Sequence, residues 1–113
     1  MNKFRAVKTV VDGITFDSKA EARRYGSLKM LEKGKRITRL ELQPRFKLYG
    51  KNGGYICEYR ADFQYFELDA NGVAIGMVIE DVKSPVTAKN PVYRLKVKLL
   101  KDNQPGLDFR EVS

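Results

Sequence analysis

The chain has 113 residues, 42% hydrophobic and 32% charged, which suits one folded domain over residues 1–113 and is too apolar for a disordered chain. Lysine and arginine number 22 against 14 acidic residues, and the resulting charge of +8 favours a polyanionic partner such as nucleic acid. Histidine is absent and Cys57 is the only cysteine, which excludes an intrachain disulfide, a Cys/His zinc site and histidine-assisted nucleophilic catalysis.

The first predicted element is a β-hairpin over Thr9–Phe16. Its centre, Asp12-Gly13, suits the positive φ values of a two-residue type I′ turn between β-branched flanks. Ser18 and Glu21 follow with the spacing of a capping box, in which Ser18 is the N-cap of a helix and Glu21 lies in its first turn. A helix is therefore expected to begin directly after the hairpin.

This first helix is predicted to run to about Lys33 and to end at Gly34. At 100° per residue, one stripe of the helix holds Tyr25, Leu28, Leu31 and also Glu21. Glu21 is therefore expected to point toward the sheet. Two roles remain open for its carboxylate, which either bonds the backbone near Ser18 as part of the capping box or contributes to a functional site.

Three strands are predicted next, over Arg45–Tyr49, Tyr55–Leu68 and Ala74–Lys83, while residues 35–44 receive no element. Strict alternation in the second strand places Asp62 on its polar face. In the third strand, Asp81 and Lys83 share a side, and Glu80 points the opposite way. Its nearly continuous apolar run is typical of a central strand buried on both faces.

A second helix is predicted from Asn90-Pro91 to about Lys101, because asparagine is a favourable N-cap and proline suits the first helical position. Its apolar arc holds Val92, Tyr93, Val97, Leu99 and Leu100. Leu107–Val112 alternates as a last strand. The expected order is hairpin, helix, three strands, helix and strand. It predicts an α/β or α+β fold in which helices flank a mixed β-sheet.

Asp62 and the run Asp81-Val82-Lys83 carry the strongest indication of chemistry. Mg²⁺ prefers oxygen ligands and is usually held by one or two carboxylates together with substrate phosphate. Carboxylates at strand ends beside a lysine suit a cation next to a phosphate. Each residue also has a structural alternative: a cross-strand ion pair for Asp62, a turn-initiating role for Asp81, and solvent exposure for Lys83.

Several segments of the chain resemble PD-(D/E)XK nucleases, whose core is a helix, three strands, a helix and a strand. The segments are Phe16–Glu21, Leu40–Pro44, Tyr59–Phe63 and Glu80–Lys83. More narrowly, they resemble a family from phages and prophages that was long catalogued as a domain of unknown function and is similar to Holliday-junction-resolvase-like endonucleases. The resemblance covers nearly the whole chain and implies a restriction-endonuclease-like core.

The resemblance implies four catalytic residues, Glu21, Asp62, Asp81 and Lys83, although Ala61 replaces the usual proline before the first acid. Glu21, Asp62 and Asp81, together with the Val82 carbonyl, would hold one or two Mg²⁺ ions, with Mn²⁺ as a substitute. Lys83 would orient the nucleophile and neutralise charge on the phosphoryl oxygens. Cleavage by such enzymes typically leaves a 5′-phosphate.

The predicted DNA contacts come from Lys96, Arg94, Lys98 and Gln43, although Gln43-Pro44 equally suits a simple turn into the next strand. Lys96 lies within the apolar arc of the second helix, where a lysine either snorkels to solvent or reaches a phosphate. The resulting hypothesis is a Mg²⁺-dependent endonuclease acting on branched DNA, and two symmetric cuts in a junction imply a homodimer. The alternative is a catalytically inactive nucleic-acid-binding module with the same fold. A cytoplasmic location without a membrane is expected, in the host cell if the protein is phage-encoded.

Overall fold

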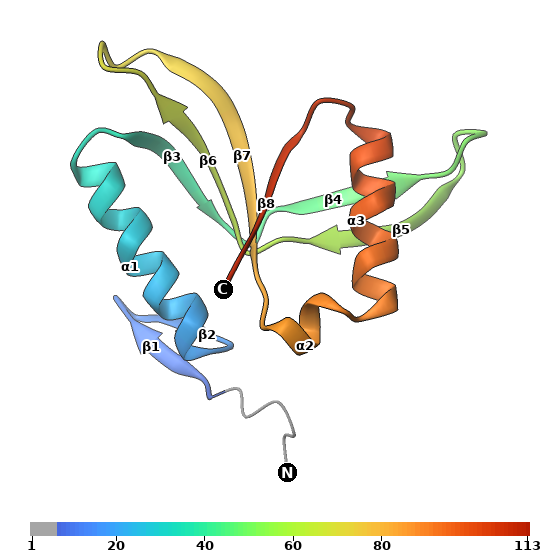
Figure 1. The fold of residues 1–113 in the computed structure, drawn as a ribbon, viewed down its shortest axis with the longest axis horizontal. Coiled ribbons are helices and arrows are strands. Elements are labelled where there is room, and N and C mark those ends of the chain that lie inside the picture. The colour runs from blue at the N-terminus through green and yellow to red at the C-terminus, as the bar shows by residue number, and fades with distance from the viewer. Residues whose placement is uncertain (1–6) are drawn as a thin grey trace.

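The structure is a computed structural model that describes residues 7–113 (Figure 1). Its elements are β1 Thr9–Val11, β2 Ile14–Phe16, α1 Lys19–Lys33, β3 Ile37–Leu42, β4 Arg45–Tyr49, β5 Tyr55–Arg60, β6 Phe63–Leu68, β7 Ala74–Val82, α2 Pro85–Ala88, α3 Pro91–Asn103 and β8 Asp108–Val112. None of the helices in this described part is long and apolar enough to cross a membrane.

The main sheet has four strands in the order β3-β6-β7-β8. β3 and β7 each pair with β6 in an antiparallel manner, whereas β8 pairs with β7 in parallel. The parallel pair is joined by α2 and α3, because a parallel connection must cross over the sheet. The predicted mixed sheet with flanking helices and an N-terminal hairpin is therefore confirmed.

Two apolar clusters cover the two faces of the sheet. One lies under α1 and includes Leu28 and Phe63, and the other lies under α3 and includes Leu48 and Leu100. The central strand β7 contributes Val78 to the first cluster and its neighbour Ile79 to the second. Alternate residues of β7 are thus buried on opposite faces, which explains its apolar run.

The predicted strand Tyr55–Leu68 is wrong as one element, because the chain bends between β5 and β6 at Ala61-Asp62. The neighbouring segment, in which β3 pairs with β6 and β4 pairs with β5, bends at the same level between β3 and β4, where Gln43 has a φ of 53°. Two backbone hydrogen bonds hold the bend together: Gln43 N donates to the Asp62 carbonyl at 2.9 Å, and Ala61 N donates to the Pro44 carbonyl at 3.0 Å. The pairs β3–β6 and β4–β5 thus form one long, bent hairpin. The β3–β6 part packs on α1, and the β4–β5 part packs on α3.

Other predictions of local structure vary in outcome. The Asp12-Gly13 turn has the expected positive φ values of 53° and 76°, and α1 has the predicted start and end. β3 and α2 were not predicted, so the expected order of three strands between two helices is wrong. The apolar arc of α3 is also wrong at Val92, which is 62% exposed.

Candidate functional site

One pocket of about 700 Å³ brings the predicted catalytic residues together. Glu21 comes from the first turn of α1, Asp62 from the bend between β5 and β6, and Asp81, Val82 and Lys83 from the end of β7, and all five line this pocket. These elements meet here because Asp62 N donates to the Glu80 carbonyl at 3.1 Å, which fixes the bend against β7. The sequence prediction that these distant residues converge is consistent with this geometry.

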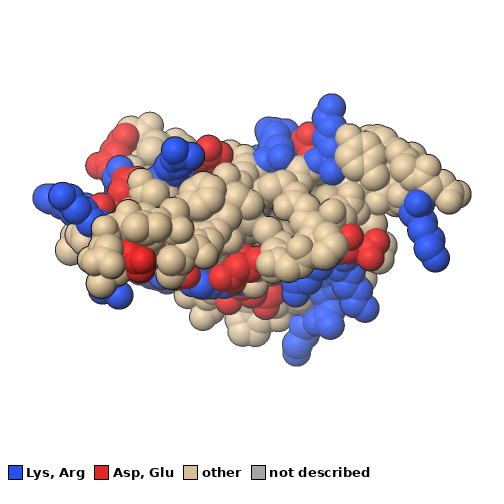
Figure 2. Space-filling view, turned by 90° about the horizontal axis from the view of Figure 1, so that it is seen from above, with Lys and Arg blue, Asp and Glu red and all other residues tan. Residues whose placement is uncertain are grey.

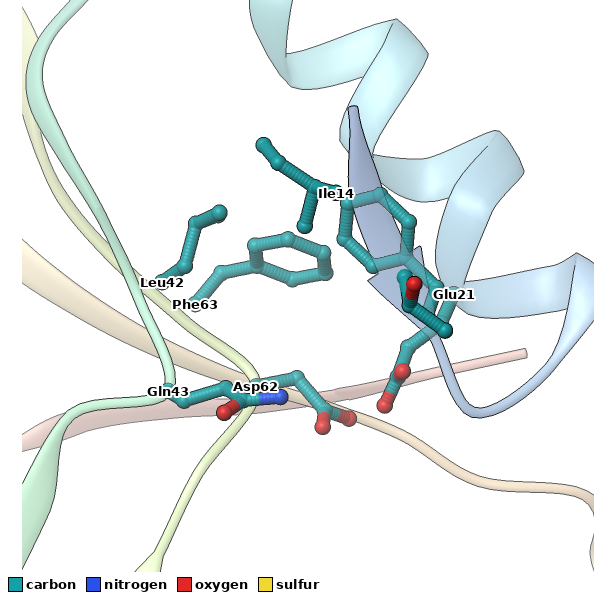
Figure 3. Close-up of a pocket in the computed structure, with 8 residues that line it drawn as sticks. Ile14, Glu21, Leu42, Gln43, Asp62 and Phe63 are labelled. Atoms are coloured by element: carbon teal, nitrogen blue, oxygen red, sulfur yellow. The ribbon is translucent and has the colours of Figure 1, made fainter. Parts of the chain in front are cut away.

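Glu21 and Asp62 form a close acidic pair at the mouth of a second, smaller cavity. Figure 3 shows their carboxyl groups turned toward each other, with the Gln43 side chain alongside Asp62. Burial, followed by the hydrogen bond and negative charge of Asp62, raises the pKa of Glu21 from 4.5 to about 8. Asp62 is held by the backbone, since Val82 N donates to its Oδ2 at 2.7 Å.

Both roles considered for Glu21 are present in the structure. Glu21 N donates to Ser18 Oγ at 3.1 Å, which is the forward half of the predicted capping box. Glu21 Oε2 accepts a hydrogen bond from Asp17 N at 3.0 Å, one residue before the expected partner. The carboxylate thus caps the helix through one oxygen and faces Asp62 within the pocket.

Asp81 and Lys83, which also line the pocket, form an ion pair with each other. The Lys83 Nζ lies 3.1 Å from Asp81 Oδ1, and the Tyr59 hydroxyl donates to Asp81 Oδ2. Burial raises the pKa of Asp81 from 3.8 to about 6, even though Lys83 acts in the opposite direction. Lys83 also lies 4.7 Å from the centre of the Tyr93 ring, a cation–π distance. Tyr59 and Tyr93 were not predicted, because no local pattern identifies them as partners of these residues.

The acidic residues provide a partial ligand set for a divalent cation. Within residues 7–113, no three Asp, Glu or Cys side chains are grouped closely enough to hold a metal ion among themselves. Mg²⁺ needs only one or two carboxylates when water and phosphate complete its shell, and Glu21 with Asp62 supplies two. Asp81 accepts bonds from Tyr59 and Lys83, but a carboxylate has about four acceptor positions, so it retains capacity. The residues present fit such an ion.

The structure places three of the four predicted DNA contacts on α3, away from the lining of the pocket. Lys96 Nζ donates to the Glu58 carbonyl at 3.1 Å, so its position in the apolar arc is explained by a bond that joins α3 to β5. Arg94 and Lys98 are exposed on α3, and none of these three residues lines the pocket. Gln43 is exposed beside Asp62 and lines the smaller cavity. It is the one predicted contact next to the site.

Two further features were missed in the sequence. Arg60 and Lys19 line the pocket and add positive charge, although neither was predicted as a site residue. Glu80, fully buried on the α1 side of β7, receives bonds from Arg24 Nε at 2.7 Å and Nη2 at 2.6 Å, and one from the Tyr65 hydroxyl. Because Arg24 lies about one turn after Glu21, this ion pair fixes α1 relative to the end of β7.

Comparison with known proteins assigns the chain to a family. The family model described as "Protein of unknown function (DUF1064)" matches residues 1–113. The chain belongs to this family. The DUF1064 description names no activity, so the resemblance to PD-(D/E)XK nucleases stays a prediction that the match does not address. No curated protein and no solved structure shows a significant match.

Proposed function

We propose that this protein is a Mg²⁺-dependent DNA endonuclease that cleaves phosphodiester bonds in branched DNA. The observation that carries this function is the shared pocket, where carboxylates from α1, the β5–β6 bend and β7 lie with a lysine inside a protein of charge +8. A basic surface attracts the phosphate backbone, whereas the acidic pocket suits a cation beside one phosphate. Two cuts in a junction require two sites, so the proposed enzyme is a homodimer.

The residues of the pocket have distinct proposed roles. Glu21, Asp62 and Asp81, with the Val82 carbonyl, would hold Mg²⁺, which would supply Lewis-acid stabilisation of charge on the phosphoryl oxygens and activation of water. Lys83 lies at the wall of the pocket beside Asp81, where its ammonium group orients the attacking water and neutralises negative charge on the phosphate. The Tyr59 hydroxyl fixes the orientation of Asp81.

One observation favours a second function, an inactive nucleic-acid-binding module with the same fold. Asp81 is engaged by Tyr59 and Lys83, and no three-carboxylate cluster is present in the described residues. A protein that retained only the basic surface would bind DNA without cutting it. Both functions therefore predict DNA binding, but only the endonuclease predicts cleavage.

Cleavage of supercoiled plasmid and of a labelled four-way junction separates these functions. With Mg²⁺ or Mn²⁺, the intact protein should nick the plasmid and cut the junction. Asp81→Asn and Lys83→Ala should each lower the rate by about 100-fold or more while DNA binding is retained. Lys33→Ala, at an exposed position on α1, is the control and should cut normally. If the intact protein cuts neither substrate with either ion, the binding module is favoured.

A further inference from the structure

The hairpin β4–β5 has one buried and one open face. The pairs Phe46 with Tyr59 and Leu48 with Cys57 belong to the cluster under α3. The alternate pairs, Arg45 with Arg60 and Lys47 with Glu58, lie on the opposite face, because paired residues of antiparallel strands share a face. We call these four residues the outer face of the hairpin.

The outer face is predominantly basic. Its single acid, Glu58, is paired with Arg45 at 2.9 Å. The side chains of Arg45 and Arg60 are 62% and 47% exposed, and Lys47 is also exposed. Figure 2 shows lysine and arginine side chains projecting from both sides of the half of the molecule that contains β4, β5 and α3. The charge of this face is complementary to a phosphate backbone.

Exposed tyrosines lie at the far end of the same hairpin. Tyr49 and Tyr55 are 41% and 59% exposed, and their ring centres lie 6.0 Å apart. Tyr49 N donates a hydrogen bond to Oδ1 of Asn103 in α3 at 2.8 Å, and Asn103 Nδ2 donates one to the Tyr49 carbonyl at 3.0 Å. Tyr49 is thus held on an anchored strand, and Tyr55 is its partner on the neighbouring strand. Exposed aromatic rings stack on unpaired bases, and neighbouring basic residues bind the phosphate backbone.

The outer face is continuous with the catalytic pocket. Arg60 belongs to both, since it pairs with Arg45 across the hairpin and lines the pocket with Asp62. From Arg60 to Tyr55 along β5 the distance is about 17 Å at a rise of roughly 3.3 Å per residue. That length corresponds to about five stacked nucleotides of one strand. A strand that enters the pocket can therefore follow the hairpin to the tyrosines.

We propose that the outer face of β4–β5 binds a single-stranded segment of nucleic acid, with its phosphates on Arg45, Lys47 and Arg60 and its bases on Tyr49 and Tyr55. This inference rests on the proposed function in identifying the pocket at one end as the place of cleavage. It assigns the principal nucleic-acid contact to the hairpin, whereas three of the four contacts predicted from the sequence lie on α3. It also defines the substrate as DNA with an unpaired strand next to the cleaved bond.

Fluorescence anisotropy in EDTA measures this binding without cleavage. The intact protein should bind a labelled single strand at least about 5-fold more tightly than a duplex of equal length, since one stacked base contributes about that factor. Tyr55→Ala should remove this preference. The double variant Arg45→Ala/Lys47→Ala should weaken binding to the single strand and reduce its salt slope by about 1.4, for two lost phosphate contacts.

Two double variants with the same loss of charge serve as controls. Arg23→Ala/Lys33→Ala changes exposed residues of α1, and Arg94→Ala/Lys98→Ala changes exposed residues of α3. Both should bind nearly as the intact protein does, and melting curves should confirm that every variant is folded. Equal binding of single strand and duplex, or a hairpin variant no weaker than the controls, would overturn the inference.

Failure of the proposed binding face can be told apart from failure of the proposed endonuclease function. Hairpin-dependent binding without any cleavage by the intact protein would retain the binding face and reject the endonuclease. Metal-dependent cleavage with binding that is insensitive to the hairpin variants would retain the endonuclease and reject the binding face.

Discussion

Glu21 is buried beside Asp62 in the pocket, and this environment makes the protonation of Glu21 sensitive to pH. Its pKa of about 8 lies above the usual 4.5, chiefly because the residue is only 8% exposed and then because Asp62 is adjacent. The folded state therefore binds this proton more tightly than the unfolded state does. The stability gained from protonated Glu21 is fully present below pH 4.5 and is lost as the pH rises through about 8.

Glu21→Gln should flatten this part of the pH dependence, because the amide stays neutral and preserves the shape of the side chain. Between pH 4.5 and 8, the free energy of unfolding of the intact protein should fall by roughly 2–4 kcal/mol more than that of the variant. Urea unfolding at several pH values in EDTA measures the difference. Parallel curves for the two proteins would show that Glu21 does not titrate in this range.

At the residue scale, the sequence predicted the positions of the acidic groups better than their partners. Glu21 follows from the helical stripe and Asp81 from the end of an apolar strand, because both patterns are local. Tyr59 and Arg24 contact Asp81 and Glu80 across the fold, and no local pattern identifies such pairs. The partner of Lys96 could not be predicted from the sequence either, since its bond to the Glu58 carbonyl depends on how α3 packs on β5.

At the scale of elements, the ion pair between Arg24 and Glu80 holds α1 against β7. The Glu80 side chain is fully buried and receives two bonds from the guanidinium group. Charged pairs of this kind contribute little net stability when both partners are present, but a buried charge without its partner is costly. The position of Glu21 relative to Asp81 therefore depends on an intact pair.

Arg24→Ala should destabilise the protein by about 3–5 kcal/mol, because it leaves the buried Glu80 carboxylate without its cation. Lys29→Ala removes the exposed Lys29–Glu32 pair of the same helix and should leave the stability nearly unchanged. The double variant Arg24→Met/Glu80→Leu should recover most of the loss. Denaturant unfolding measures all three, and similar small losses in both single variants would contradict the structural role of Arg24.

Alternation along a strand could not predict the bend at Ala61-Asp62. Tyr59, Ala61, Phe63 and Tyr65 are all buried, so the pattern continues across the bend, but the first two face the α3 cluster and the others face the α1 cluster. β3 was missed because Arg39 has a φ of 55°, and the pairing with β6 shifts register between Thr38 and Glu41. Both features depend on the partner strand rather than on the local sequence.

At the scale of the whole molecule, a small group of acidic residues is buried in a basic protein. The charge of +8 extends over the surface, whereas Glu21, Glu80 and Asp81 are the buried acids of the described chain. Glu80 is neutralised by Arg24, and among residues 7–113 Lys83 is the one cation in direct contact with Glu21, Asp62 or Asp81. This imbalance is the physical basis for proposing a divalent cation in the pocket.

Titration of the protein with Mn²⁺, followed by electron paramagnetic resonance of the free ion, tests this central claim most directly. We expect the intact protein to bind Mn²⁺ at pH 8, alone or with a single-stranded oligonucleotide, and Mg²⁺ to displace it. Asp62→Asn should abolish the binding, and Lys33→Ala should leave it unchanged. Absence of Mn²⁺ binding under both conditions, or equal binding by Asp62→Asn and the intact protein, would contradict a cation site in this pocket.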